Sequence, residues 1–335
     1  MPASHDMERP LTMPTAPHYP EKLVVGTRGS ELALTQAEAT EAALRAAFPG
    51  ISIERKIIQT TGDRRTDVSL ANVAKAEGVF DKGVFIKEIE DALAAGEVDV
   101  AVHSLKDLPT TLDGRFELAG VLERAPVRDV WLARSPADSL EQIAAGARVG
   151  TSSVRRVCEV LHRRPDLTAC DLRGNVPTRL RKLAAGEACD ASILAEAGLV
   201  RLGLLPPLPP DGGGPERVIG HESLCAWRLD PTEFFPAAGQ GAIGLEIRAG
   251  DTAARTMVEK IRHSASWLRI SAEREFLRLL DGGCHTPVGV WSEIHAGELH
   301  LTARVFPESG GTPRHGHARG ADPLAAATEL YQSLT

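Results

Sequence analysis

Short apolar runs rich in β-branched residues alternate with amphipathic Ala- and Leu-rich segments along most of the chain. Such runs are typical of buried strands, and apolar residues spaced three and four apart are typical of helices. The segment after residue 153 shows the helical spacing, with Val154, Val157, Cys158 and Leu161 on one side. The alternation as a whole predicts parallel α/β units. Strands are expected at residues 23–26, 51–59, 98–103, 148–150, 169–172, 191–194 and 242–248, and helices at 31–48 and 84–95.

The last part of the chain has a different pattern. Residues 264–280 are amphipathic with a helical period, and two apolar runs follow at 288–295 and 299–306. The Gly-containing turn 296–298 between these runs predicts an antiparallel hairpin, so we expect a smaller α+β domain here. The Pro- and Gly-rich stretch 203–220 is expected to be an exposed loop or a domain edge.

Length and composition limit the number of domains and exclude several classes of protein. At 335 residues the chain is expected to hold two or three domains. Its 45 acidic residues outnumber 38 basic ones, and the net charge of −7 disfavours broad nucleic-acid binding. No apolar run reaches the roughly 18 residues of a membrane span.

The cysteines and the N-terminal segment indicate the compartment. Five cysteines are scattered without a C-x-x-C pair, which excludes a disulfide scaffold and a zinc ribbon and favours a reducing compartment. Residues 1–20 hold five prolines and no apolar core of a leader, so we interpret them as a disordered tail and not as a signal peptide. A cytoplasmic location is therefore expected.

The first strand-to-helix junction reads Thr-Arg-Gly-Ser at residues 27–30. Ser30 is placed to cap the helix, whose free backbone N–H groups point at the junction, and Arg28 adds a cation there. This combination favours an anion site. An ordinary capped helix with a surface arginine explains the same residues.

A second junction reads Gly-Thr-Ser-Ser-Val-Arg-Arg at residues 150–156. Thr151 and Ser153 supply capping hydroxyls, while Arg155 and Arg156 fall in the first helical turn. The helix dipole disfavours positive charge there by about 0.3–1 kcal/mol for each residue. A bound anion reverses that cost, and so does pairing with Asp or Glu across a domain interface.

Positive charge is concentrated around this junction although the protein is acidic. Residues 148–182 contain nine basic and three acidic residues, and the basic ones include Arg173 and Arg179. Guanidinium groups bind carboxylates in a bidentate manner, so a ligand with several carboxylates fits. Nucleic acid is a weaker alternative because the segment lacks interleaved aromatic residues, and a solvated basic face is another.

The buried strand at 98–103 runs directly into Ser104, Leu105, Lys106 and Asp107. Ligand sites of open α/β sheets lie at the C-terminal ends of strands. A cation and a carboxylate side by side can hold an anionic group and stabilise a transient cation. A surface ion pair is the alternative.

Cys284 differs from the other cysteines because it lies in a Gly-rich loop, Asp-Gly-Gly-Cys-His-Thr-Pro, at residues 281–287. Cys158, by contrast, falls on an apolar helical position and is expected in the core. A nucleophile or an attachment point fits Cys284, and so does an incidental loop thiol. No metal is expected because no second ligand stands at a recognised spacing.

Six segments in order resemble the porphobilinogen deaminase (hydroxymethylbilane synthase) family of tetrapyrrole biosynthesis. They are VVGTRGSELA, DVAVHSLKDLPT, RVGTSSVRR, DLRGNVPTRL, FPAAGQGAIGLEIR and DGGCHTPVG. Each is weak alone, but together they follow the family's order from about Lys22 to the end of the chain.

The resemblance implies two periplasmic-binding-protein-like α/β domains, with the active site between them, and a smaller C-terminal α+β domain. The implied limits are 21–122 with 237–262 for domain 1, 123–236 for domain 2 and 263–335 for domain 3. The resemblance also implies that Cys284 holds a dipyrromethane cofactor through a thioether. Four porphobilinogen molecules are then added head to tail with loss of ammonia, and water releases hydroxymethylbilane.

The family's site residues match as follows. Asp107 is the implied catalytic residue, which stabilises a cationic azafulvene-like species and handles protons. Arg124 and Arg201 match family arginines as well. The residues implied to hold the carboxylates of the cofactor and of the growing chain are Arg28, Ser30, Ser104, Lys106, Thr151, Ser153, Arg155, Arg156, Arg173, Arg179 and Gln240.

The chain departs from the family in two places. The segment 70–85 is longer than the family pattern, so neither Lys75 nor Lys82 is assigned a substrate contact, and Thr61 stands where many members have arginine. We expect a monomer with porphobilinogen as its small-molecule substrate and without a nucleic-acid or membrane partner. An anion-binding protein of the periplasmic type is the alternative, which the lack of a signal peptide disfavours.

Overall fold

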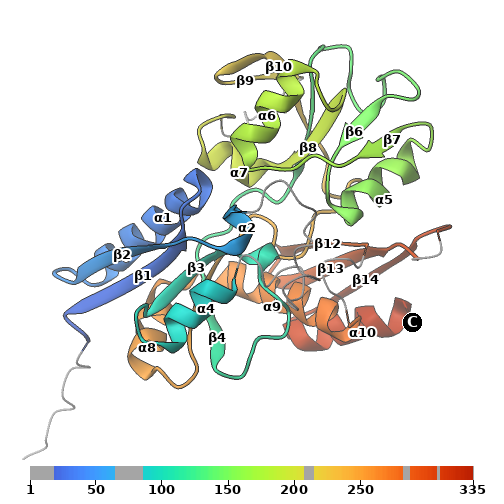
Figure 1. The fold of residues 1–335 in the computed structure, drawn as a ribbon. Coiled ribbons are helices and arrows are strands. Elements are labelled where there is room, and N and C mark those ends of the chain that lie inside the picture. The colour runs from blue at the N-terminus through green and yellow to red at the C-terminus, as the bar shows by residue number, and fades with distance from the viewer. Residues whose placement is uncertain (1–18, 65–85, 207–214, 282–286, 308–309, 335) are drawn as a thin grey trace, which may run out of the picture.

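The computed structural model describes residues 19–64, 86–206, 215–281, 287–307 and 310–334. These residues form two α/β domains and a smaller C-terminal domain beside them (Figure 1). Cys284, Lys75, Lys82 and residues 1–18 of the expected tail lie outside the described residues.

The first sheet has five described strands in the order β2-β1-β3-β11-β4. Strands β2, β1 and β3 run parallel, as predicted, whereas β11 is antiparallel to both of its neighbours. Strand β11 follows the strands of the second sheet in the sequence. The chain therefore returns to the first sheet at β11, which runs in the opposite direction to its neighbours. The strands are β1 (Lys22–Arg28), β2 (Ser52–Ile58), β3 (Val100–Ser104), β4 (Phe116–Val121) and β11 (Ile243–Arg248).

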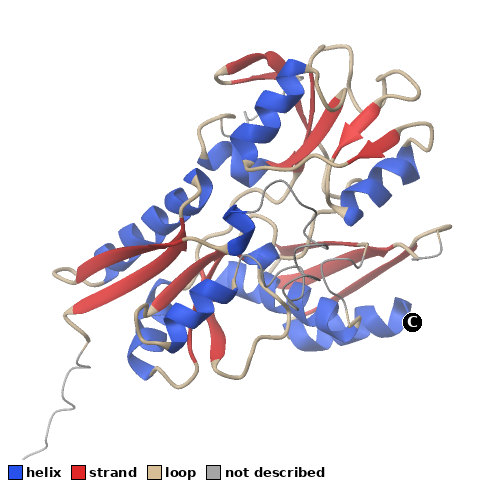
Figure 2. Ribbon diagram, in the orientation of Figure 1, coloured by secondary structure: helices blue, strands red, loops and turns tan. Residues whose placement is uncertain are grey.

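Helices cover both faces of this sheet (Figure 2). Helices α1 (Glu31–Ala47) and α8 (Thr252–Ile261) bury Leu44 and Met257 against one face. Helix α4 (Lys87–Ala94) buries Ile89 and Leu93 against the other face. The short helix α2 (Thr61–Arg64) follows β2.

The second sheet has six described strands in the order β7-β6-β8-β5-β10-β9. Strands β7, β6 and β8 are parallel, and β5 and β10 are antiparallel to their neighbours, so the predicted parallel arrangement is only partly right. Helix α5 packs on one face, and α6 and α7 pack on the other. The elements are β5 (Asp129–Ala133), β6 (Arg148–Gly150), α5 (Val154–Arg163), β7 (Thr168–Cys170), α6 (Val176–Ala185), β8 (Ala191–Ala195), α7 (Glu196–Arg201), β9 (Glu216–Val218) and β10 (His221–Arg228).

The Pro- and Gly-rich stretch 203–220 is not loop throughout, because its residues 216–218 form β9. This short strand pairs antiparallel with β10, whose backbone supplies the hydrogen-bonding edge. The pairing partner follows the stretch in the sequence, so composition within the stretch did not reveal it. Strands β4, β5 and β10 also escaped the prediction.

The predicted hairpin of the C-terminal domain is confirmed, with β12 (Val288–His295) antiparallel to β13 (Glu298–Val305). A third strand, β14 (Arg314–Gly320), pairs with β13. Helices α9 (Ser264–Leu279) and α10 (Pro323–Leu334) pack on one face of this sheet. The predicted fold class is thus confirmed, while the residue limits of the three domains stay a prediction. None of the helices in the described part of the chain has the length and apolar character of a membrane span.

Candidate active site

Strands β1 and β3 are parallel neighbours, so their C-terminal ends lie at the same edge of the first sheet. Arg28 ends β1, and Ser30 caps α1 by accepting a hydrogen bond from the backbone N–H of Ala33, as predicted. Ser104 ends β3 and exchanges hydrogen bonds with the amide of Gln36 on α1. The two sequence motifs of the first domain therefore meet at one edge.

Asp107 is the last residue of a 3-10 helix, η2 (Leu105–Asp107), that continues β3. Its half-buried carboxylate forms no hydrogen bond with any described residue. It interacts electrostatically with Lys106, beside it in the chain, and with Arg156 and Arg179 of the second domain. The strand end of one domain thus faces the guanidinium groups of the other.

The cations around Asp107 are largely desolvated. Burial, together with the charge of Arg156, lowers the pKa of Lys106 to about 8. Burial and the same arginine lower the pKa of Arg179 to about 10. Nε of Arg155 is buried without a hydrogen-bond partner among the described residues. Crowded, poorly solvated cations of this kind are stabilised by bound carboxylates.

Asp129, at the start of β5, holds the arginine pair of the second domain and was missed by the sequence analysis. Its fully buried carboxylate accepts hydrogen bonds from Nη1 of Arg155 at 2.8 Å and from Nη2 of Arg156 at 2.7 Å. Burial raises the pKa of Asp129, but the charges and hydrogen bonds of the two arginines outweigh this and hold the pKa well below its usual range. Asp129 therefore orients the pair. An acidic residue directly before an apolar run was the available signal.

By sequence, either a bound anion or a protein carboxylate was expected to offset the charge of Arg155 and Arg156. The structure shows that a protein carboxylate, that of Asp129, offsets the charge. Asp129 lies in the sheet on which α5 packs, and therefore not in another domain. Both arginines also donate to backbone carbonyls, Arg155 to Phe235 and Arg156 to Ile193. The pair is thus held rigidly at the N-terminus of α5.

Helix α5 does not bury the apolar side that its sequence pattern predicted. Val154 is 38% exposed, and Cys158 is only half-buried. The buried side carries Arg155, Arg156 and Glu159 together with Val160 instead. Buried charges are tolerated where partners of opposite charge are in contact, and those partners come from elsewhere in the chain.

Gln240 connects the two domains. Its Nε2 donates to Oδ1 of Asp129 at 3.0 Å, and its Oε1 accepts from Nζ of Lys106 at 3.4 Å. The backbone around Gln240 is fixed in turn by Arg124, whose Nε donates to the Gln240 carbonyl at 2.8 Å. Lys106, Gln240 and Asp129 therefore form a continuous polar path across the domain boundary.

The remaining predicted residues have local partners. Arg173 Nε bonds Asp171 at 2.7 Å, and Arg179 Nε donates to the Gly174 carbonyl at 2.7 Å. Ser153 caps α5 by accepting from the Arg156 N–H, as predicted, and Thr151 accepts from the Ser153 N–H at 3.2 Å. Arg179 is brought to Asp107. Arg173 and Thr151 contact only near neighbours in the sequence, Asp171 and Ser153, in the hydrogen bonds given above, and neither of them contacts Asp107 there.

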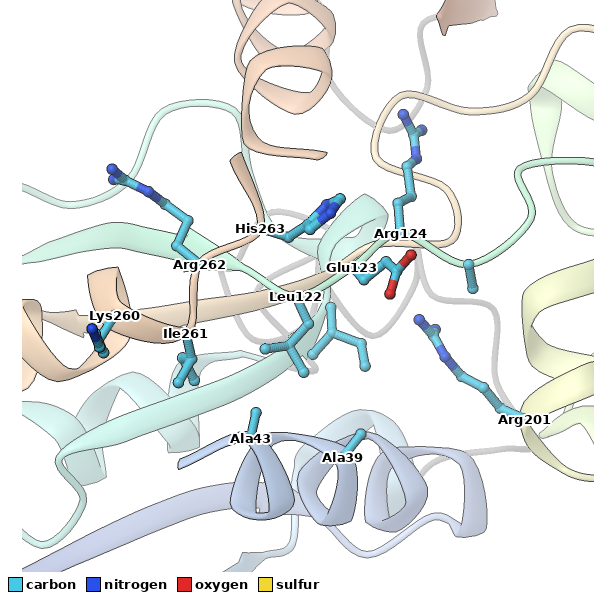
Figure 3. A pocket seen from close by; sticks show the side chains of 12 residues that line it. Ala39, Ala43, Leu122, Glu123, Arg124, Arg201, Lys260, Ile261, Arg262 and His263 are labelled. Carbon is cyan, nitrogen blue, oxygen red and sulfur yellow. The ribbon is translucent and has the colours of Figure 1, made fainter. Parts of the chain in front are cut away.

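Arg124 and Arg201 line a pocket of about 590 Å³ where the chain passes between domains (Figure 3). Arg124 forms a bidentate ion pair with buried Glu273 of α9, at 2.6 and 2.8 Å, and its side chain extends away from the pocket floor of Ala39 and Ala43. Arg201 donates to the Gly241 carbonyl at 2.7 Å. Both arginines therefore support the backbone that carries Gln240.

Replacement of Asp129 by asparagine is expected to lower the free energy of unfolding by about 3–5 kcal/mol, because two buried guanidinium groups lose their counter-charge. Chemical denaturation at pH 7 measures the loss. The folded-state pKa of Asp129 is depressed, so its contribution is present above its unfolded pKa of about 3.9 and fades below it. The difference in the free energy of unfolding between wild type and Asp129→Asn should therefore become smaller below about pH 4.

The matched control is Asp113→Asn, which breaks the exposed pair with Arg115 and is expected to change stability very little. Equal effects of the two substitutions would show that Asp129 does not anchor the arginines.

Two family models cover most of the chain. "Porphobilinogen deaminase, dipyromethane cofactor binding domain" matches residues 23–256, and "Porphobilinogen deaminase, C-terminal domain" matches residues 267–334. Among solved structures, the periplasmic aliphatic sulphonate binding protein SsuA from Escherichia coli is 16% identical, with 78% of this chain and 71% of that chain covered. Its TM-score of 0.38 is too low to bear on function.

Curated relatives share the same family name. The porphobilinogen deaminase of Syntrophobacter fumaroxidans is 42% identical, with 85% of this chain and 84% of that protein covered. The porphobilinogen deaminase of Roseiflexus sp. is 41% identical, with 94% and 96% covered. The first family model spans more than half of the residues, and these relatives match nearly the whole length, so the chain belongs to the porphobilinogen deaminase family.

Proposed function

We propose that this chain is a hydroxymethylbilane synthase, a transferase of tetrapyrrole, porphyrin and haem biosynthesis. It joins four porphobilinogen molecules head to tail on a covalently held dipyrromethane primer and releases four ammonia molecules. Water then frees the linear product, hydroxymethylbilane. Family membership supports this function, as does the cofactor named in the description of the matching family model.

One observation carries the proposal: a half-buried carboxylate, Asp107, is surrounded by Lys106, Arg156 and Arg179 at the boundary of two domains. Loss of ammonia from porphobilinogen leaves a cationic azafulvene-like species. A carboxylate fixed nearby stabilises that charge and can move protons, while the surrounding cations bind carboxylate side chains. The site thus matches a substrate that is anionic at its edges and becomes cationic at its reacting carbon.

The donors present fit a dipyrromethane group, which carries acetate and propionate side chains. Nε of Arg155 has no hydrogen-bond partner among the described residues, and the pKa values of Lys106 and Arg179 are lowered. These are features of cations that a polycarboxylate would stabilise. When bound, the cofactor supplies the free pyrrole position to which the first substrate is added. The residues proposed to hold it and the growing chain are Arg28, Ser30, Ser104, Lys106, Thr151, Ser153, Arg155, Arg156, Arg173, Arg179 and Gln240.

We assign the thioether attachment to Cys284, in the segment that matches the family's Gly-Gly-Cys motif. Each protein residue then has a distinct task. Arg156 and Arg179 bind carboxylates, and Asp107 stabilises the developing cation and exchanges protons. Gln240 keeps Lys106 aligned with Asp129. We further propose a cytoplasmic monomer that acts on a small molecule without a nucleic-acid or membrane partner.

Intact mass spectrometry of the purified chain tests the proposal. We expect a covalent dipyrrole adduct, and further increments of one pyrrole unit after brief incubation with porphobilinogen. An unmodified chain that binds porphobilinogen without adding or releasing anything would support an anion-binding protein and contradict the enzyme.

A further inference from the structure

A single side chain of the C-terminal domain touches several parts of the second domain. Arg304 of β13 reaches Glu159 of α5, with 2.7 Å between Nη1 and Oε2. The same Nη1 donates to the Glu233 carbonyl at 3.0 Å, and the guanidinium lies over the Phe235 ring, 4.5 Å from its centroid. Arg304 therefore joins α5 to the segment that precedes Gln240.

The backbone of β12 approaches the same segment very closely. The Val290 N–H donates to the Pro236 carbonyl at 2.8 Å. A Cβ atom on Gly289 would lie 2.3 Å from Cβ of Phe235 and 3.0 Å from Oε1 of Glu159. Only glycine fits this approach, so β12 is seated against the second domain at a defined position.

This contact continues into the active site. The Phe235 carbonyl, next to Pro236, accepts a hydrogen bond from Nη1 of Arg155 at 2.5 Å. Arg155 and Glu159 are one helical turn apart on α5, and Arg155 is anchored to Asp129. Arg304 is thus linked to the arginine pair through both Glu159 and Phe235.

The charge of Glu159 depends on Arg304 for compensation. Glu159 is fully buried, Arg304 binds its Oε2, and its Oε1 has no hydrogen-bond partner among the described residues. Burial raises the pKa of Glu159 to about 6, although Arg304 and Arg155 act against the rise. Asp129 faces Glu159 from β5. Two histidine rings lie nearby, and burial lowers the pKa of both: His162 on α5 contacts Phe306, and His315 on β14 contacts Phe235.

We propose that Arg304 and Glu159 are positioning residues that fix β12 relative to the arginine pair of the active site. The inference rests on the proposed function. The links through Glu159 and through the Phe235 carbonyl both end at Arg155, so the position of β12 limits where the arginine pair can lie. The arginine pair is proposed to hold the carboxylates of the growing chain, and accurate placement of the pair therefore affects the chemical step.

The test compares Arg304→Met, Arg304→Lys and Arg319→Met as holoenzymes with porphobilinogen as substrate. Methionine keeps most of the stem but removes the charge, and we expect kcat to fall about tenfold with KM nearly unchanged, because small misplacements are costly to chemistry. Lysine should restore most of the rate. Arg319 lies exposed on β14 of the same sheet and serves as the control, with no expected change.

Glu159→Gln keeps the test decisive if Arg304→Met does not fold. Because the folded-state pKa of Glu159 is raised, its charge disfavours folding above about pH 6, and the neutral amide should fold at least as well as wild type. We expect kcat at pH 8 to fall several-fold. The difference in kcat between this variant and wild type should become smaller as pH falls through about 6, where Glu159 in the wild type becomes neutral.

The outcomes separate this inference from the proposed function. Intact mass first establishes that wild type and variants carry the adduct. Wild type without an adduct or turnover contradicts the proposed function. If all proteins carry the adduct and Arg304→Met and Glu159→Gln turn over at the wild-type rate, the positioning role is wrong, even if their melting temperatures fall.

Discussion

Replacement of Cys284 by serine is expected to yield a folded protein that carries no covalent cofactor and has no activity. A thiolate is the nucleophile that forms a thioether, and a serine hydroxyl does not replace it at neutral pH. The other cysteines are poor substitutes. Burial raises the pKa of Cys189 to about 11 and also raises the pKa of Cys158 and Cys170, and Cys225 is buried.

Intact mass and a turnover assay measure this outcome, and a melting curve shows that the variant is folded. Cys170→Ser is the matched control, since it removes a half-buried thiol from β7 and is expected to keep both adduct and rate. A Cys284→Ser protein that still carries an adduct would place the attachment at another residue.

Asp107→Asn is expected to reduce turnover at least about a hundredfold, the usual scale for a general acid–base group. The amide keeps the size but removes the negative charge that stabilises a cationic species and moves protons. Because the carboxylate forms no hydrogen bond with a described residue, stability should change little. Arg156 and Arg179 keep their positive charges in this variant, so it should retain its cofactor at least in part.

Three measurements together decide the role of Asp107: the turnover rate, the melting temperature and the mass of the adduct. Normal turnover would assign the catalytic carboxylate elsewhere. A large loss of stability would instead indicate a structural ion pair with Lys106. Asp113→Asn again serves as the control for removing one surface carboxylate, and it should leave the rate unchanged.

Much of the local structure was determined by the sequence alone. Ser30 and Ser153 cap the helices that were expected after them, because a side-chain oxygen beside free N–H groups acts within a few residues. The hairpin of β12 and β13 was equally predictable from two apolar runs and a Gly-containing turn. Asp107 was recognisable at the end of a buried strand, since the end of such a strand marks one edge of the sheet.

Only the tertiary structure decided which charges are buried and what they contact. The sequence pattern of α5 predicted an apolar core side, yet the helix buries Arg155, Arg156 and Glu159. Their partners, Asp129 and Arg304, lie 26 and 145 residues away from Arg155 and Glu159, respectively. Periodicity reports a local preference for burial, whereas the burial of a charge depends on a counter-charge that the fold brings from a distant part of the chain.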